Sequence, residues 1–238
     1  MNRTTILLSI AAMLTFAFRS DKPAYLIYDA EGRNVKYQKM IETISSADVV
    51  FFGELHDNPI SHWLELEITA GLHSVAGNSL VIGAEMFEAD NQLLLDEYLG
   101  SKYQADKFEA EAKLWKNYKT DYKPLVEFAR KNGLPFIATN IPRRYASMVS
   151  RGGFEVLDSL SAEAQGYIAP LPVTYDPELK CYKDMLSMPG MPGMGGKQNL
   201  NFPKAQAIKD ATMAHFIALN MAEGKKFIHY NGAYHSDN

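Results

Sequence analysis

Residues 48–59 read Asp-Val-Val-Phe-Phe-Gly-Glu-Leu-His-Asp-Asn-Pro and join an apolar run to a cluster of polar side chains. The run over residues 48–52 predicts a buried strand of a parallel sheet, because such a strand is covered on both faces and need not alternate. Gly53 ends the run, and Pro59 opens a helical pattern, as proline often does at the first position of a helix. The stretch therefore predicts a strand, a short polar turn and a helix, which is the repeating unit of α/β folds.

The polar residues of this turn lie where α/β proteins bind ligands, outside the carboxyl end of a strand. Glu54 and His56 are thus placed for chemistry or for ligation. Asp57 and Asn58 have a second interpretation, because either side chain could cap the helix that follows. The sequence leaves both roles open for these two residues.

Further apolar runs and helical patterns alternate along the chain. Short apolar runs predict strands over residues 24–28, 79–84, 134–138 and 226–230. Apolar residues at helical spacing predict helices over residues 37–46, 59–75, 91–99, 106–129 (interrupted at Pro124), 143–149 and 204–222. We therefore expect an α/β fold with a mostly parallel central sheet flanked by helices.

A long segment without such patterns separates two of the predicted helices. Residues 170–203 contain six prolines and the Met-Pro-Gly run of residues 188–196. A loop of this length in a compact domain is usually a lid, a binding loop or a disordered segment, so we expect a helical and loop insertion in the fold. The chain ends just past the strand at residues 226–230, as a sequence truncated before a last crossover helix and strand would.

Composition narrows the classes of function. The 238 residues carry a formal net charge of -4 and show no basic stripe, so nucleic-acid binding is not indicated. Cys181 is the single cysteine, which excludes an internal disulfide framework and a zinc site built from several thiolates. Any metal site must therefore use histidine, carboxylate or tyrosine side chains.

The first 20 residues have the pattern of an export segment. A basic start at Arg3 precedes an apolar run over residues 6–18, which is long enough for a signal-peptide core and short for a membrane span. We expect residues 1–20 to be a cleaved signal peptide or a retained anchor, and residues 21–238 to form one domain. A periplasmic or membrane-associated location follows, without a nearby cysteine for lipid attachment. A buried N-terminal helix is the alternative interpretation.

Four predicted strands end in polar residues, and this agreement is the main indication of a functional site. The sets are Glu54 with His56, Glu85, Asn140 with Arg143 and Arg144, and Asn231 with His235. Because the carboxyl ends of parallel strands lie at one edge of a sheet, we expect one pocket lined by these groups. His62 could approach the same edge. The alternative is that these polar groups only satisfy one another and cap helices.

Taken together, these motifs resemble those of the ChaN-like proteins, part of the haem-uptake and Tiki group that also includes erythromycin esterases. The resemblance covers nearly the whole chain after the export segment and rests on residues 49–59 with His62, 83–87, 140–143, 206–213 and 232–235. The Gly-Glu-x-His-Asp-Asn motif is fairly specific, whereas the others confirm order and spacing. The chain departs from the family pattern because it lacks the lipid-attachment cysteine of many members, and the resemblance leads us to expect a further C-terminal part of the family beyond residue 238.

The resemblance implies an exported, iron-regulated protein that binds haem, with a homodimer around the haem and an outer-membrane haem-uptake receptor as further partners. Tyrosine is a known haem ligand. Tyr118, Tyr122 and Tyr182 are the candidates for the axial position, because they lie in or near aromatic or proline-rich segments. The run over residues 188–196 is soft and apolar enough to cover a porphyrin.

The second functional class is a hydrolase, since relatives in the group cleave esters or peptides. The candidate catalytic residues are Glu54, His56, Glu85 and His235, with one histidine as general base on water. A divalent metal held by His56, Glu85 and His235 is another route. The candidate ligand-binding residues around them are Asp57, His62, Asn140, Arg143 and Arg144. No Gly-x-Ser-x-Gly sequence occurs, so a serine hydrolase is not indicated, and whether the protein is an enzyme stays open.

Overall fold

The computed structural model of the protein describes residues 22–187 and 199–237. The chain divides into two compact units, residues 1–40 and residues 41–238. The predicted export segment and the Met-Pro-Gly run lie outside the described residues. Among the helices that are described, none is both long enough and apolar enough to cross a membrane.

The described part of the first unit is a small antiparallel hairpin. Strand β1 (Ile27–Tyr28) pairs with strand β2 (Asn34–Val35). Asp29 closes the turn between them, because its side chain accepts a hydrogen bond from the backbone N–H of Arg33 at 2.8 Å. Helix α2 (Tyr37–Ile44) contains the boundary between the two units.

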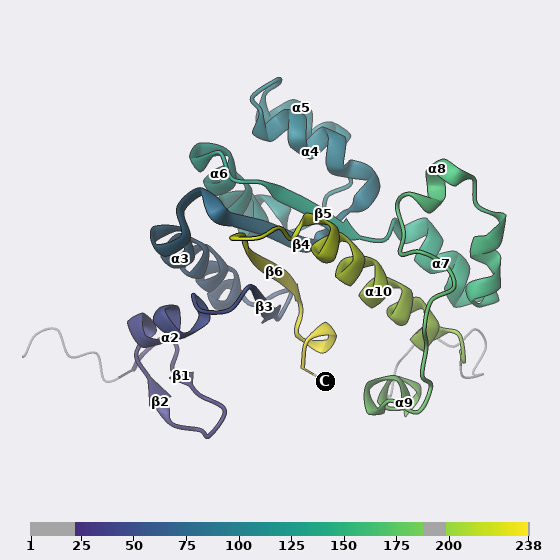
Figure 1. Cartoon of the computed structure of the whole chain (residues 1–238), viewed down its shortest axis with the longest axis horizontal. Helices are drawn as coiled ribbons and strands as arrows, with labels where there is room; N and C mark the ends of the chain where they lie inside the picture. The colour runs from purple at the N-terminus through teal and green to yellow at the C-terminus, as the bar shows by residue number, and fades with distance from the viewer. Residues whose placement is uncertain (1–21, 188–198, 238) are drawn as a thin grey trace, which may run out of the picture. The chain divides into compact units, whose positions relative to one another are not determined.

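A parallel four-stranded sheet forms the centre of the second unit (Figure 1). Its strands are β3 (Val49–Glu54), β4 (Leu80–Glu88), β5 (Phe136–Asn140) and β6 (Lys226–Gly232). The order across the sheet is β3-β6-β4-β5, and every neighbouring pair is parallel. This arrangement confirms the predicted α/β fold with a parallel central sheet. Strand β6 follows β5 in the sequence but lies between β3 and β4 in the sheet.

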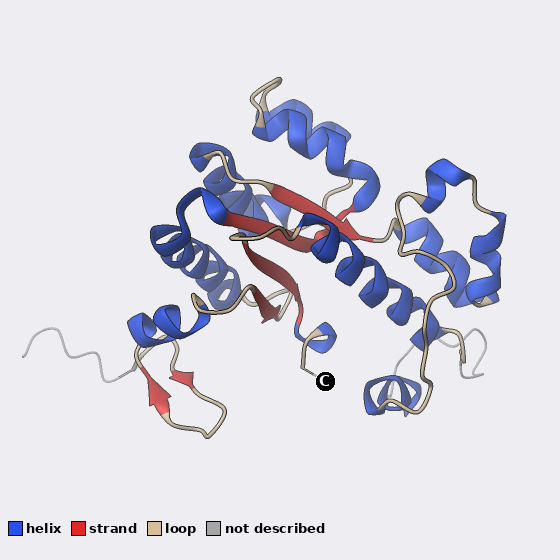
Figure 2. Cartoon of the chain, viewed as in Figure 1, coloured by secondary structure: helices blue, strands red, loops and turns tan. Residues whose placement is uncertain are grey.

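Helices surround this sheet, as Figure 2 shows. The α-helices after α2 are α3 (Pro59–Ala76), α4 (Gln92–Leu99), α5 (Ala105–Glu111), α6 (Lys123–Asn132), α7 (Arg143–Gly152), α8 (Ala162–Gln165), α9 (Lys180–Ser187) and α10 (Phe202–Asn220). Shorter 3-10 helices lie at Gly77–Ser79, Ala89–Asn91, Phe154–Ser159 and Ala233–His235, and a π-helical turn lies at Tyr118–Tyr122.

Strand β6 is covered by helices on both faces. On one face, the Tyr230 hydroxyl shares a hydrogen bond with the Thr69 hydroxyl of α3 at 2.6 Å. On the other face, Phe227 packs with Val81 of β4 and Ile217 of α10. Successive side chains of a strand point to opposite faces, so α3 and α10 lie on opposite sides of the sheet. Burial on both sides explains why this strand has no alternation of polar and apolar residues.

The strands at the carboxyl edge are longer than predicted. β4 continues through Glu85 to Glu88 instead of ending at residue 84, and β6 continues to Gly232. Glu85 can remain inside a strand because its carboxylate accepts a hydrogen bond from the backbone N–H of Gly232 at 2.9 Å. This hydrogen bond satisfies the buried Glu85 carboxylate. A prediction based on hydrophobicity alone places such a charged residue outside the strand.

Residues 106–129 are largely helical, as predicted, but the break does not lie at Pro124. Helix α5 ends at Glu111, residues 112–117 are not helical, and the π-helical turn at Tyr118–Tyr122 leads into α6, which begins at Lys123. Pro124 lies in the first turn of α6, where the missing N–H of proline has no intrahelical partner to lose. The proline therefore begins a helix instead of interrupting one. The predicted loop over residues 170–203 is also interrupted, because it contains α9.

Candidate functional site

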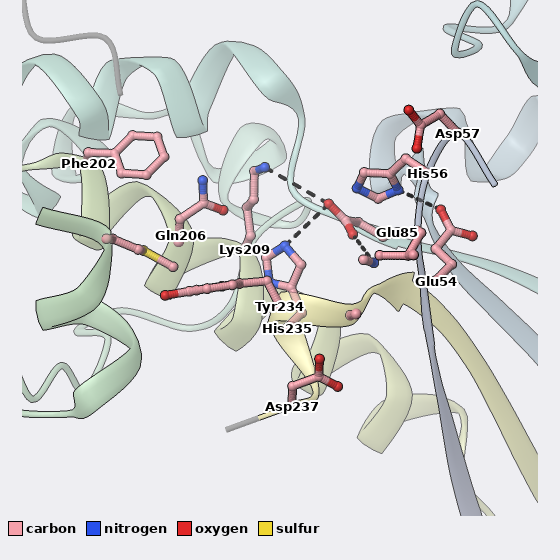
Figure 3. Close-up of a pocket in the computed structure, with 14 residues that line it drawn as sticks. Glu54, His56, Asp57, Glu85, Phe202, Gln206, Lys209, Tyr234, His235 and Asp237 are labelled. Carbon is pink, nitrogen blue, oxygen red and sulfur yellow. Dashed lines mark hydrogen bonds and ion pairs between the residues drawn. The ribbon is translucent and has the colours of Figure 1, made fainter. Parts of the chain in front are cut away.

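A pocket of about 870 Å³ opens at the carboxyl edge of the sheet, and we call it the edge pocket. Its polar lining consists of Glu54, His56, Asp57, Glu85, Gln206, Lys209, His235 and Asp237, and its other lining residues are Leu55, Met185, Phe202, Gly232, Ala233 and Tyr234. In Figure 3, Glu54, His56 and Glu85 lie at one end and Phe202 lies at the other. The volume is typical of sites for small molecules and cofactors.

Each side of the edge pocket comes from a different element. β3 ends in Glu54, β4 carries Glu85, and the 3-10 helix after β6 carries His235. Helices α9 and α10 contribute Met185 and Lys209. Parallel strands bring residues that are distant in sequence to one edge of the sheet, which explains why these side chains converge.

Glu54 and His56 form the first histidine–carboxylate pair of the pocket. His56 Nδ1 lies 2.6 Å from Glu54 Oε1, and the Tyr122 hydroxyl donates to the same oxygen. Burial raises the pKa of Glu54, but its hydrogen bonds to His56 and Tyr122 and the neighbouring Glu65 and His62 side chains outweigh burial and leave the pKa below its usual value. The bond to Glu54 raises the pKa of His56. The His56 side chain is 49% exposed, so its ring is held from behind and accessible from the pocket.

Glu85 and His235 form the second pair. His235 Nε2 lies 3.4 Å from Glu85 Oε1, and His235 Nδ1 lies 2.5 Å from Asp210 Oδ1. Burial raises the pKa of Glu85, but His235, Lys209 and the Gly232 N–H lower it to about 2. Burial lowers the pKa of His235, but the two carboxylates raise it to about 9. At neutral pH the pair is therefore an ion pair inside the pocket.

Gly232 leaves a small open space between the two pairs. A Cβ atom at this position would lie 2.8 Å from His56 Nε2 and 3.6 Å from Glu85 Oε2. The first distance is too short for a side chain to be accommodated without movement of the His56 ring. The absence of a side chain at Gly232 thus keeps His56 Nε2 accessible beside the Glu85 carboxylate.

The structure brings five of the predicted site residues to the edge pocket: Glu54, His56, Asp57, Glu85 and His235. His62 lies behind the pocket, buried, with its Nε2 donating to the His56 carbonyl at 3.1 Å. Asn140 does not line the pocket. It is buried and donates from Nδ2 to the Glu85 carbonyl at 2.9 Å, so it supports the backbone of β4.

The two predicted arginines lie away from the edge pocket. Arg143 and Arg144 begin α7 and are exposed. Arg144 Nη1 pairs with Asp90 Oδ2 at 2.5 Å, and its guanidinium lies 4.3 Å from the centre of the Tyr145 ring. The helix that follows β5 therefore directs Arg144 to a different surface from the one that the polar strand ends share.

The three tyrosines predicted as haem ligands are buried. Tyr118 and Tyr122 are 2% and 1% exposed, and Tyr182 is 9% exposed. The Tyr122 hydroxyl donates to Glu54, and the Tyr182 hydroxyl donates to Asp210 Oδ2 at 3.2 Å. Burial raises the pKa of all three phenols, which disfavours the phenolate form that ligates iron.

Several site residues escaped the sequence interpretation. Met185 and Phe202 carry no sequence signal for a binding site, because an apolar residue on a helix usually indicates a core position. Tyr234 stood next to His235 in a quoted motif and could have been found there. Glu65 is completely buried near Glu54, and its position three residues after His62 on one helix face was an available signal.

Comparisons with known proteins agree with this fold. A solved structure described as cofacial heme binding to ChaN of Campylobacter jejuni matches with a TM-score of 0.66 and 18% identity, covering 91% of this chain and 82% of that one. Protein RETICULATA-RELATED 5, chloroplastic, from Arabidopsis thaliana is 24% identical over 216 residues, which cover 83% of this chain. The match takes in only 29% of the length of the plant protein.

The sequence also matches a family described as haem-binding uptake, Tiki superfamily, ChaN, over residues 40–238. The matched range contains the whole parallel sheet and every residue that lines the edge pocket. The chain therefore belongs to the ChaN family of the Tiki superfamily.

Proposed function

We propose that the protein binds haem in the edge pocket. The observation that carries this proposal is the family match over the residues that build the pocket. The lining residues fit the group, because Met185, Phe202 and Tyr234 offer an apolar surface for a porphyrin. Lys209, which is 27% exposed and lies 4.0 Å from Glu85, offers a cation for a propionate group.

His56 is the side chain that the geometry favours as the iron ligand. Its ring is half exposed in the pocket, and its Nδ1 is held by the Glu54 carboxylate. Histidine ligands of metals commonly have such a carboxylate partner, which orients the ring and increases its basicity. Haem supplies the iron that an imidazole or phenolate can ligate. Tyr234, which lines the pocket, and Tyr182, which belongs to the same apolar cluster, are the tyrosine alternatives.

A Soret titration of the purified protein with haem tests this proposal. We expect His56→Ala to weaken haem binding at least about tenfold, while His73→Ala, on α3 and outside the pocket lining, leaves it unchanged. If Tyr182→Phe or Tyr234→Phe weakens binding and His56→Ala does not, the axial ligand is a tyrosine. Absence of any Soret shift in the unaltered protein would end the haem proposal.

The facing pairs also favour a second candidate function, hydrolysis of an ester or peptide. Glu54 holds the His56 ring in the orientation that a general base on water requires. His235, with a pKa raised to about 9, can supply a proton or a positive charge opposite it. A divalent metal on His56, Glu85 and His235 is an alternative route to the same reaction. In this case His56→Ala and Glu85→Ala would abolish turnover of a model ester or peptide while the Soret titration persists.

We also infer export and a role in iron acquisition. The apolar run over residues 6–18 supports export, and the family supports uptake of haem. Fractionation that finds the intact chain in the cytosol would contradict export. If a homodimer forms around haem, the mass measured by light scattering will double when haem is added. If the protein binds an outer-membrane receptor, the receptor will be captured from membranes by haem-loaded protein and not by haem-free protein.

A further inference from the structure

A second group of ionisable side chains lies behind the edge pocket. Glu54 of β3 meets His62 and Glu65 of α3 in the interior, where the three residues are 3%, 5% and 0% exposed. His62 Nδ1 lies 3.1 Å from Glu65 Oε1 and 3.6 Å from Glu54 Oε2. We call this group the inner cluster. It is distinct from the face of Glu54 that points to the pocket, because Glu54 Oε1 is occupied by His56 and Tyr122.

Four polar atoms of the inner cluster have no hydrogen-bond partner among the described residues. They are Glu54 Oε2, His62 Nδ1, Glu65 Oε1 and Glu65 Oε2. Unsatisfied atoms of this kind are rare in protein interiors, since each costs free energy when it leaves water. Here they come from three side chains, and representatives of all three lie within 4.8 Å of one another, so a single ligand could satisfy them.

The hydrogen bond on the far side of His62 indicates what kind of ligand this is. His62 Nε2 lies 3.1 Å from the His56 carbonyl oxygen, and a carbonyl can only accept. The Nε2 atom therefore carries a proton, and Nδ1 is the nitrogen that faces the two carboxylates. A metal ion bound between them would take the place of any proton on Nδ1, because a histidine ligates through an unprotonated nitrogen. A ring nitrogen that donates to a backbone carbonyl while the other faces anionic oxygens is the usual arrangement of a metal-bound histidine.

We propose that the inner cluster binds one divalent first-row transition metal ion. Its ligands would be His62 Nδ1, Glu54 Oε2 and both oxygens of Glu65, which are the four unpartnered atoms. Bonds of the usual length around a tetrahedral ion separate the ligand atoms by about 3.4 Å, close to the 3.1 and 3.6 Å separations at His62 Nδ1. One imidazole nitrogen with carboxylate oxygens suits Zn²⁺, Fe²⁺ or Mn²⁺.

The ion would link the protein interior to the edge pocket through Glu54. One carboxylate oxygen would bind the ion while the other holds His56 Nδ1 at 2.6 Å. Fixing Glu54 in this way fixes the His56 ring, so the inner cluster is a positioning site for the pocket. It differs from a metal site on His56, Glu85 and His235, which would lie within the pocket itself.

Titration of chelator-treated full-length protein with Zn²⁺, followed by calorimetry, tests the proposal. We expect one Zn²⁺ per chain and a raised unfolding temperature, because a ligand that binds only the folded state stabilises it. Glu65→Gln should weaken Zn²⁺ binding by about 100-fold or more, since it removes ligand charge and outer-shell changes alone cost 10–100-fold. Glu67→Gln, on the same helix, is the matched control and should leave binding unchanged.

His235→Ala separates the two sites. If Zn²⁺ binding persists in Glu65→Gln and disappears in His235→Ala, the ion lies in the edge pocket and the proposal is wrong. Absence of stoichiometric binding in the unaltered protein also overturns it. Anomalous X-ray scattering from zinc-soaked crystals of the unaltered protein gives the answer without any variant, because a peak must lie between Glu54, His62 and Glu65.

Discussion

His56 is the residue that both proposed functions would use. Its Nδ1 is held by Glu54, and its Nε2 faces the space left by Gly232. Its ring packs edge-on against Trp115, with 4.9 Å between the two ring centres. A half-exposed histidine with one nitrogen fixed is preorganised, because little rotational freedom is lost when the other nitrogen binds. Haem ligation and general-base catalysis would use the same free nitrogen.

Gly232→Ala tests this geometry directly. The new Cβ would lie 2.8 Å from His56 Nε2, so the ring must move. The backbone φ of -54° at Gly232 is open to any residue. We therefore expect weakened haem binding in a Soret titration with a nearly unchanged urea unfolding midpoint. Normal haem affinity in this variant would show that His56 Nε2 does not face the ligand.

The Glu85–His235 ion pair predicts a dependence of stability on pH. The folded-state pKa of His235 is raised from 6.5 to about 9, so its stabilisation is fully present below pH 6.5 and is lost as pH rises through 9. The pKa of Glu85 is lowered from 4.5 to about 2, so its contribution is present above pH 4.5 and is lost as pH falls toward 2. Both contributions are complete only between about pH 4.5 and 6.5.

The measurement is the free energy of unfolding in urea at pH 6.5 and at pH 9.5. In the unaltered protein, the His235 contribution that is lost over this range is about 3 kcal/mol. His235→Gln should show a correspondingly smaller change with pH. The carboxylates that face His235 are those of Glu85 and Asp210, and Lys209 lies 4.0 Å from Glu85. An equal pH dependence in both proteins would contradict the predicted pKa.

At the scale of single elements, the start of α3 fixes the turn that carries Glu54 and His56. Asn58 caps the helix, since its Oδ1 accepts from the backbone N–H groups of Ile60 and Ser61 at 2.9 and 3.2 Å. The structure thus assigns capping to Asn58 and leaves Asp57 at the pocket.

Asn58→Ala should lower the free energy of unfolding by about 1 kcal/mol, because two backbone donors at the helix start lose their partner. Asn58→Asp preserves an acceptor and is the matched control. The two variants are compared by urea unfolding, and equal stability of Asn58→Ala and the unaltered protein would show that the cap contributes nothing.

The contact of β4 with β6 depends on a glycine in the middle of the sheet. A Cβ at Gly83 would lie 2.6 Å from the ring of Phe227, which is completely buried. Gly83→Ala should therefore cost about 1–3 kcal/mol of stability through overpacking. Phe227→Leu would relieve the clash, so the double variant should be more stable than the sum of the single effects predicts. Additive losses would contradict a direct contact.

At the scale of the whole molecule, one unit contains both the parallel sheet and the edge pocket. All four sheet strands and all lining residues belong to residues 41–238. Since α2 begins at Tyr37 and buries Ile41, a chain that starts at residue 37 keeps this helix intact. We expect that shortened chain to unfold cooperatively and to give the same Soret titration as the full chain. A loss of haem affinity would show that the first unit takes part in binding.

Local sequence patterns were sufficient to predict the class of fold and part of the site. The apolar run before Gly53 predicted β3, and the run over residues 226–230 predicted most of β6. Polar residues after the strands pointed to the sheet edge, because strand direction alone brings parallel carboxyl ends together. Such local patterns are predictive because the spacing of apolar residues along one element reflects which of its faces are buried.

Which of these residues share a surface depends on how distant segments of the chain pack together. Arg144 comes shortly after β5 in the sequence, just as Glu85 lies near the end of β4. Arg144 nevertheless pairs with Asp90 outside the pocket, whereas Glu85 lines it. Glu65 falls within the predicted helix over residues 59–75, and the packing of α3 against the sheet places it in the interior beside Glu54. Met185 and Phe202 reach the pocket only because α9 and α10 pack there. Contacts between distant segments depend on the geometry of packing, which no local pattern of hydrophobicity encodes.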